Sequence, residues 1–260
     1  MTGGRGEHGV GVDEAAVLRS MPVLALALDM DDPLVADRLA RRLQPFFSVA
    51  KVGLELFTAV GPDAVTGLRD LGYDVFLDLK LHDIPTTLAK AAAVAGSLGA
   101  RFLTMHAAGG VVMLRSGVEG FHAGADRAGV ARPEALGVTV LTSEADVATG
   151  LLSERVDIVL DAGCDGLVCA GADLTEVRRR APDQVLVVPG TRLPGGETHD
   201  QARPTTPFEA VAAGADVLVI GRMVTHAPDP VKAAEHLVEH LGGTPTGERP
   251  AVAPVQDRSR

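Results

Sequence analysis

Three charged residues lie close together at the end of an apolar run. The stretch "VFLDLKLHDIPTT", Val75 to Thr87, begins like a buried strand but contains Asp78, Lys80 and Asp83. Side chains at positions i and i+2 of a strand point to the same face, so we expect Asp78 beside Lys80, with Asp83 in the loop just beyond. Buried charges are costly unless they are paired. An alternation of carboxylate and ammonium groups would keep each member ionised and could stabilise charge that develops in a reaction.

Polar and ionisable groups recur at the ends of other apolar runs. Each has a common structural explanation, because an Asp after a strand is often a helix N-cap and a Lys is often solvated. Their repetition at the same end of successive runs favours a functional site, and Lys51 is expected to join Asp78 and Lys80. We expect His82 to make structural hydrogen bonds and leave open whether His106 supports the site. The full set beyond the opening stretch is Asp29, Lys51, His106, Thr142, Arg192 and Arg222.

The elements that must position these groups are eight short apolar runs. Stretches with helical spacing, such as "DPLVADRLARRL" and "IPTTLAKAAAVAGSLG", lie between most of them. Strands that alternate with helices pair in parallel, and eight such units predict an α/β fold, a single closed (β/α)8 barrel of the TIM type. The alternative is an open doubly wound sheet, but "ALDMDDP" follows the first run in place of a G-x-G-x-x-G motif. The runs are residues 23–29, 47–53, 75–81, 101–107, 135–142, 165–171, 185–190 and 216–221.

The domain organisation follows from the same pattern. A chain of 260 residues, 46% of them hydrophobic, is within the range of one barrel domain. We expect the barrel at 21–241, with an N-terminal extension at 1–20 that is rich in Gly and charge. A C-terminal tail at 242–260 is rich in Pro and polar residues. Both extensions are expected to be flexible, because neither has apolar periodicity to pack.

Charge and composition argue against several classes of protein. There are 24 Lys and Arg against 34 Asp and Glu, a formal net charge of -10, so electrostatics does not favour nucleic acid or an anionic membrane as a partner. The first sixteen residues contain no apolar segment typical of a secretory signal, and no run is long enough to span a membrane, which favours a cytoplasmic protein. Cys164 and Cys169 are expected to be buried thiols, and no metal site is expected, because neither Cys nor His has ligand spacing.

The motifs together resemble one family. "DLKLHDIPTT" resembles the D-x-K-x-x-D-I-P-x-T signature of the orotidine 5'-phosphate decarboxylase family, and "ALD", "VAKVG", "VTVLTS", "VVPGTR" and "VIGRMVTHAPDP" follow the same pattern in order. The resemblance extends from about Val23 to Val238. A lone D-x-K-x-x-D is less specific, because related barrel decarboxylases and aldolases of sugar phosphates carry it. The resemblance implies a (β/α)8 barrel that converts orotidine 5'-phosphate to UMP and CO2, the last step of de novo pyrimidine biosynthesis, without a cofactor.

The resemblance also assigns expected roles to residues. Asp29 and Lys51 would contact the ribose hydroxyls, with Lys51 also in the charge array. Asp78 would lie against the substrate carboxylate, and Lys80 would protonate C6 after CO2 leaves. Asp83 completes the catalytic set.

A homodimer is implied by three of the matching positions. In this family Asp83, Ile84 and Thr87 contribute to the site of the neighbouring subunit, so the expected assembly is an obligate homodimer with shared active sites.

The remaining expected contacts are with the pyrimidine and the 5'-phosphate. Thr142 and Ser143 would face the pyrimidine. The loops after the seventh and eighth runs would grip the phosphate, as they commonly do in barrels. Thr191 and Thr86 depart from the usual pattern, which has a branched apolar residue and Asn there, but neither change removes a charged group. The substrate-binding set expected in these loops is Pro189, Arg192, Gln201, Gly221 and Arg222.

Two alternatives remain open at this point. The first is a decarboxylase of a sugar phosphate that works through an enediolate held by Mg²⁺. The second is a catalytically silent sensor of a phosphorylated ligand. The retained Lys80 and the full Asp and Lys array argue against a sensor, because binding alone would need only a phosphate grip.

Overall fold

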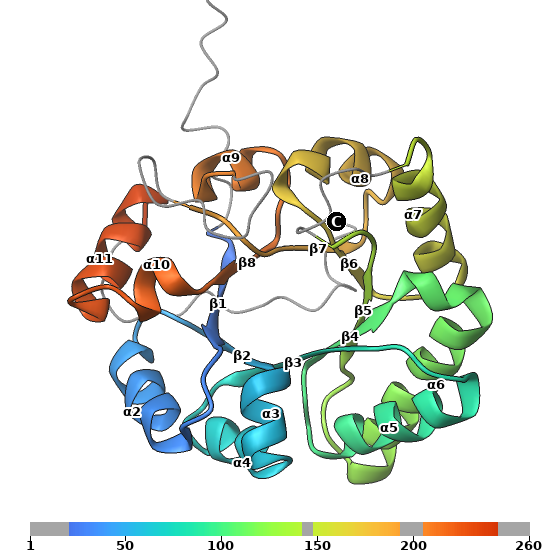
Figure 1. Ribbon diagram of the computed structural model, residues 1–260, viewed down its shortest axis with the longest axis horizontal. Coiled ribbons are helices and arrows are strands. Elements are labelled where there is room, and N and C mark those ends of the chain that lie inside the picture. The colour runs from blue at the N-terminus through green and yellow to red at the C-terminus, as the bar shows by residue number, and fades with distance from the viewer. Residues whose placement is uncertain (1–20, 142–147, 193–204, 244–260) are drawn as a thin grey trace, which may run out of the picture.

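The computed structural model describes residues 21–141, 148–192 and 205–243 and contains one closed barrel (Figure 1). The expected N-terminal extension, 1–20, and residues 244–260 of the expected tail lie outside the described residues. The strands run in the order of the sequence around the barrel. They are β1 (Val23–Leu28), β2 (Val49–Gly53), β3 (Asp74–Leu81), β4 (Phe102–His106), β5 (Glu134–Val138), β6 (Gly166–Val168), β7 (Val185–Val188) and β8 (Val217–Ile220).

The pairing of the first and last strands closes the barrel. Every strand pairs in parallel with its two neighbours, and β1 pairs with both β2 and β8, with Val23 opposite Val217. An open sheet would leave β1 or β8 with a free edge. The predicted (β/α)8 barrel is therefore confirmed, and the doubly wound alternative is wrong.

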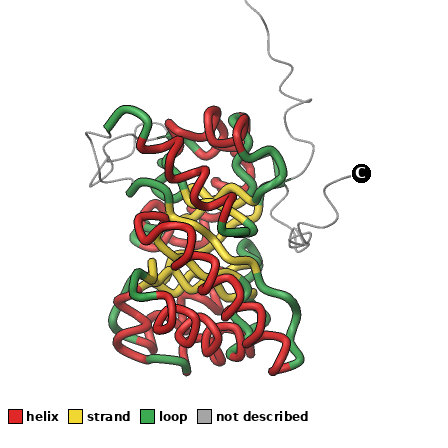
Figure 2. Tube along the Cα trace, turned by 90° about the vertical axis from the view of Figure 1, so that its right-hand side faces the viewer, coloured by secondary structure: helices red, strands yellow, loops and turns green. Residues whose placement is uncertain are grey.

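Helices surround the barrel on its outside (Figure 1), and Figure 2 shows them on both sides of the central strands. Among the described helices, none combines the length and the apolar character that crossing a membrane requires. The described α-helices are α2 (Pro33–Leu43), α3 (Leu54–Val60), α4 (Asp63–Asp70), α5 (Pro85–Ser97), α6 (Gly110–Ala128), α7 (Leu151–Asp161), α8 (Leu174–Arg180), α9 (Pro207–Ala212), α10 (Arg222–Thr225) and α11 (Pro230–His240).

Local sequence signals fix where several helices begin. Asp32 caps α2, since its carboxylate accepts from the backbone N–H of Leu34 at 2.8 Å, and Pro33 occupies the first turn, where its missing N–H costs nothing. Thr206 and Glu209 form a capping box at the start of α9.

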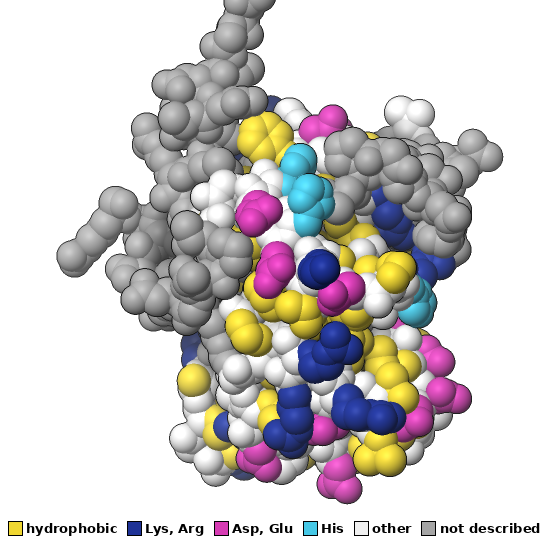
Figure 3. Space-filling view, turned by 90° about the vertical axis from the view of Figure 1, so that its left-hand side faces the viewer, with side chains coloured by type: hydrophobic (Ala, Val, Ile, Leu, Met, Phe, Trp, Pro, Cys, Tyr) yellow, Lys and Arg dark blue, Asp and Glu magenta, His cyan; other side chains and the backbone are white. Residues whose placement is uncertain are grey.

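On the face formed by α2 and α11, charges of both signs lie beside hydrophobic side chains (Figure 3).

Two apolar cores hold the strands in place, because side chains alternate between the two faces of the sheet. The inner core fills the barrel with residues such as Val49, Phe76 and Phe102. The outer core lies between the strands and the helices and includes Leu77 and Leu103. The barrel is therefore packed through its middle, and polar chemistry is confined to its ends.

The helices that follow β3 and β4 pack with their backbones in close approach. A Cβ at Gly124 of α6 would collide with the carbonyl oxygen of Ala93 in α5, so only glycine fits there. This contact holds α5 in place, and α5 is the helix that directly follows the loop with Asp83.

Candidate active site

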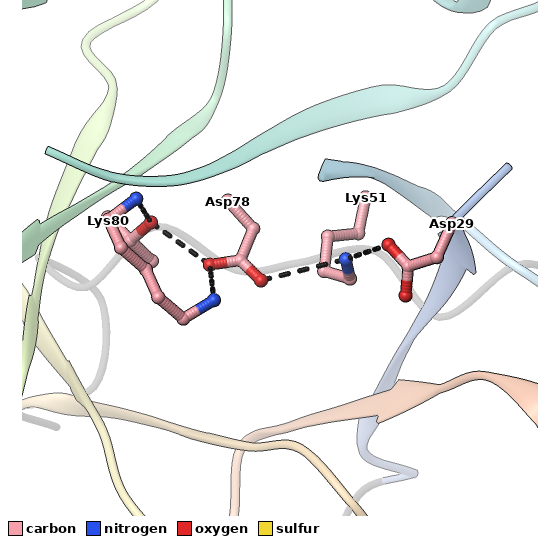
Figure 4. A network of polar contacts seen from close by, with 5 residues as sticks. Asp29, Lys51, Asp78 and Lys80 are labelled. Atoms are coloured by element: carbon pink, nitrogen blue, oxygen red, sulfur yellow. Dashed lines mark hydrogen bonds and ion pairs between the residues drawn. The ribbon is translucent and has the colours of Figure 1, made fainter. Parts of the chain in front are cut away.

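Four charged side chains from three adjacent strands meet at the carboxyl end of the barrel (Figure 4). Asp29 directly follows β1, Lys51 lies on β2, and Asp78 and Lys80 lie on β3. Lys51 Nζ lies 2.7 Å from Asp29 Oδ1 and 3.6 Å from Asp78 Oδ2. Lys80 Nζ lies 2.8 Å from Asp78 Oδ1. Carboxylates and ammonium groups therefore alternate along one row, and Lys51 joins Asp78 and Lys80 as the sequence predicts. We call these four residues the charge row.

Burial changes along the charge row. The side chain of Lys51 is 6% exposed and that of Asp78 is 14% exposed, whereas Lys80 and Asp29 reach 36% and 56%. The most buried ammonium group thus has a carboxylate on each side. This pairing offsets the cost of removing the Lys51 charge from water.

The central carboxylate of the row stays ionised despite its burial. Burial by itself would raise the pKa of Asp78, but the positive charges of Lys51 and Lys80 and hydrogen bonds from Lys80 and Thr104 outweigh it. The pKa of Asp78 therefore lies below its ordinary value. An anion fixed between two cations gives the site a preorganised field.

The backbone at Lys80 is unusual. Its φ is +47°, the only positive φ of a non-glycine residue in the described parts of the chain. The pairing between β3 and β4 shifts register between Leu77 and Leu81, as at a β-bulge. The Lys80 N–H donates to the hydroxyl of Thr104 at 2.9 Å, and that hydroxyl donates to Asp78 Oδ1 at 3.0 Å. Sequence reasoning missed Thr104, because a Thr inside the run "FLTMHA" is typical of any strand.

The residues expected to serve a neighbouring subunit lie in the loop after β3 and in the first turn of α5. Asp83, Ile84 and Thr87 are all exposed, and Ile84 is 67% exposed. The Asp83 carboxylate accepts from the Ile84 N–H at 2.7 Å. A surface groove runs beside them, lined by His82, Asp83, Ile84, Pro85, Gly109, Val112 and Met113.

The described residues of the expected phosphate-binding set follow two adjacent strands, with Arg222 as the first residue of α10. Pro189 and Arg192 follow β7, and Gly221 and Arg222 follow β8. The Arg192 N–H donates to the carbonyl oxygen of Thr205 at 3.0 Å, which ties this loop to the chain just before α9.

Three expected substrate contacts, Thr142, Ser143 and Gln201, lie outside the described residues. They belong to the segments 142–147 and 193–204, which follow β5 and β7 in the chain. Their places in the site therefore stay predictions.

The other candidate groups lie close to the site or in the core. The ring of His106, at the end of β4, lies 5.8 Å from the ring of His82. Cys164 and Cys169 are buried free thiols, as predicted. Burial, with a smaller effect of Asp165 on Cys164 and of Asp173 on Cys169, raises the pKa of each thiol to about 12. In the described ranges, His, Cys, Asp and Glu side chains form no group of three or more suited to a metal ion.

Comparison with known proteins gives a consistent result. The model of the "Orotidine 5'-phosphate decarboxylase / HUMPS family" matches residues 22–237. The orotidine 5'-phosphate decarboxylase of Anaeromyxobacter dehalogenans is 44% identical over 229 residues, which cover 84% of this chain and 97% of that protein. That of Thermobifida fusca is 43% identical over 237 residues, 85% of this chain and 96% of the relative. The crystal structure of orotidine 5'-phosphate decarboxylase from Lactobacillus acidophilus aligns with a TM-score of 0.72 at 31% identity, covering 85% of this chain and all of that one (100%).

Proposed function

The chain belongs to the orotidine 5'-phosphate decarboxylase family, and from this premise we propose how its charge row converts orotidine 5'-phosphate to UMP and CO2. The enzyme is a cofactor-independent carbon–carbon lyase of pyrimidine biosynthesis. The observation that carries the proposal is the position of Lys80, whose ammonium is paired with Asp78 while its side chain as a whole is 36% exposed.

The chemical problem is a carbanion without conjugation. Loss of CO2 from the pyrimidine leaves a lone pair at C6 in the plane of the ring, out of reach of the π system. The Lys80 ammonium stabilises this developing charge electrostatically and then donates a proton to C6. An ammonium that is already fixed by Asp78 needs no reorganisation during the reaction, which is the usual source of large electrostatic rate effects.

Asp78 has two roles in this proposal. It aims Lys80, to which it is bonded at 2.8 Å. It also lies against the substrate carboxylate, whose negative charge it repels. Because Asp78 is held ionised by the two lysines, this repulsion is present when the substrate binds and is relieved as CO2 leaves. We treat the repulsion as secondary to the stabilisation by Lys80.

The other end of the row holds the ribose. Asp29 is the most exposed member and Lys51 the most buried, so a hydroxyl that approaches from the barrel mouth meets the Asp29 carboxylate first. Lys51 then donates to a second hydroxyl from below while it balances Asp78.

The phosphate and the base occupy the loops around the row. We assign the 5'-phosphate to Arg192, Gly221 and Arg222, with Pro189 beside it, because guanidinium forks and backbone N–H groups suit a dianion. By resemblance, Gln201 joins the phosphate grip, and Thr142 and Ser143 face the pyrimidine. Binding energy from the phosphate, remote from C6, is then available to hold the ring against Lys80.

The proposed assembly is a homodimer, and we expect it in the cytoplasm. Exposure of Asp83, Ile84 and Thr87 supports it, because these side chains are available to a second copy of the chain. In the dimer, Asp83 of each subunit completes the charge row of the other.

The test is a turnover assay with the purified protein. Orotidine 5'-phosphate absorbance should fall, UMP should form, and EDTA should leave the rate unchanged. Absence of UMP formation together with Mg²⁺-dependent, EDTA-sensitive decarboxylation of a keto sugar phosphate would favour the sugar-phosphate decarboxylase instead. Binding of the nucleotide without any turnover would favour a sensor. Lys80→Ala, which should bind but not react, separates this chain's activity from that of a contaminant.

A further inference from the structure

Thr104 joins the two reacting residues from a neighbouring strand. It lies on β4, its side chain is fully buried, and its hydroxyl is both an acceptor and a donor. It accepts the Lys80 N–H at 2.9 Å and donates to Asp78 Oδ1 at 3.0 Å. We propose that Thr104 is a positioning residue for the decarboxylation, which holds the Lys80 backbone and the Asp78 carboxylate in their reactive arrangement.

The backbone of Lys80 is held in an uncommon conformation. A non-glycine residue at a φ of +47° is less stable than in an extended strand and persists only where its surroundings hold it. The register shift between Leu77 and Leu81 takes Lys80 out of the regular ladder, so its N–H needs another acceptor. The Thr104 hydroxyl supplies that acceptor. This hydrogen bond fixes the direction in which the Lys80 side chain leaves the strand.

The Asp78 carboxylate is fixed in rotation by the same hydroxyl. Oδ1 receives two hydrogen bonds, from Lys80 Nζ at 2.8 Å and from the Thr104 hydroxyl at 3.0 Å. Oδ2 is thereby turned toward Lys51, 3.6 Å away. Without the hydroxyl, Asp78 keeps both cations but loses the donor from β4 that sets its plane. One side chain thus fixes both partners of the ion pair.

Thr104→Val tests this proposal because valine has nearly the same shape and lacks the hydroxyl. The inference rests on the proposed decarboxylase activity, so turnover of the parent protein is measured first. We expect kcat to fall about ten- to a hundredfold, in line with the loss of a hydrogen bond to a charged group, while KM changes by less than about threefold. Thr104→Ser, which restores the hydroxyl, should recover most of kcat even though it removes a methyl group from the core.

A matched control removes another buried threonine hydroxyl. Thr139 is 2% exposed and donates to the carbonyl oxygen of Val168 at 3.0 Å. Thr139→Val therefore removes a buried threonine hydroxyl and its hydrogen bond to a neutral carbonyl, without touching the charge row. If the two valine variants lose stability and kcat to the same extent, Thr104 has only a structural role and the proposal is overturned. Parent-like kcat in Thr104→Val would overturn it as well.

A measurement independent of turnover keeps the two proposals apart. Hydrogen exchange of the Lys80 amide, followed by NMR, should be faster in Thr104→Val than in the parent and should return to the parent rate in Thr104→Ser. If the parent does not decarboxylate the nucleotide, the proposed function fails, whatever the exchange rates. If the parent is active and the Lys80 amide exchanges equally in all three proteins, only the role of Thr104 fails.

Discussion

Lys80 Nζ lies 2.8 Å from Asp78 Oδ1, and the two residues belong to the same strand. Replacing Lys80 by Ala removes the group that we propose both stabilises the C6 carbanion and donates the proton. Loss of one preorganised group typically costs 10²–10³ in rate, and here one residue has two roles, so we expect decarboxylation to be abolished. Steady-state turnover measures this. Far-UV circular dichroism should show that the fold is kept.

The control for that variant is Lys232→Ala, because Lys232 is exposed on α11, away from the charge row. It should retain the parent rate. Turnover of Lys80→Ala within tenfold of the parent would remove Lys80 from its proposed role.

A mixture of two inactive variants tests the shared site. If the protein is a dimer with shared sites, as proposed, Asp83→Ala and Lys80→Ala proteins should each be inactive, because every site would lack one of the proposed groups. After subunit exchange, one of the two sites in each heterodimer carries neither change, so part of the activity should return. Activity is measured before and after mixing, and exchange is verified by native mass spectrometry. Verified heterodimers without activity would place Asp83 in the site of its own subunit or outside any site.

Arg222→Ala tests the phosphate grip. Losing a charged hydrogen bond is worth roughly 1.5–3 kcal/mol, so kcat/KM should fall by about one to two decades. The matched control is orotidine, which lacks the phosphate. With it, the parent and Arg222→Ala should react at equal, poor rates, because the contact is already absent. An equal loss with both substrates would show that Arg222 shapes the site rather than holding the phosphate.

The pH dependence of stability reports on Asp78. The pKa of Asp78 is lower in the folded than in the unfolded protein. Ionisation of Asp78 therefore stabilises the fold at every pH above its pKa in the unfolded chain, which is about 4. This contribution is lost as the pH falls through the folded pKa. Asp78→Asn should therefore be less stable than the parent at neutral pH, and the difference should shrink in acid. Urea unfolding at a series of pH values measures the difference in free energy of unfolding. The control is Asp126→Asn, because Asp126 is exposed on α6. A difference that stays constant with pH would contradict this account.

The two cysteines should be chemically silent in the folded protein. Because burial raises the pKa of Cys164 and Cys169 to about 12, almost no thiolate forms at pH 8. A disulfide reagent should react with neither thiol in buffer and with both in denaturant. Rapid reaction of one thiol in the native protein would show that its part of the core opens.

The fold could be predicted from the sequence because its strands are buried on both faces and therefore appear as apolar runs. The ends of the strands were less predictable. The run 135–142 extends beyond β5, which ends at Val138, and the run 165–171 extends beyond β6, which ends at Val168. Small and apolar residues continue past the end of each strand into the loop. There, a hydrophobic residue does not indicate that the backbone pairs with a neighbouring strand.

The charge row was predictable because its spacing and alternation of sign are visible in the chain. The bulge at Lys80 and the hydroxyl of Thr104 were not, since both depend on which side chain the adjacent strand places opposite. No local pattern carries that information. A positive φ at a lysine is set by tertiary contacts rather than by residue type.

The pairing of β1 with β8 also determines when the enzyme can first work during its synthesis. Asp29 follows β1, and the position of β1 depends on its hydrogen bonds to β8, the last strand to leave the ribosome. A nascent chain that has completed β2 and β3 already carries Lys51, Asp78 and Lys80, but its first strand still lacks one neighbour. Long-range pairing of this kind is slow and comes late in folding. The growing polypeptide therefore stays inactive until nearly all of the barrel has been translated.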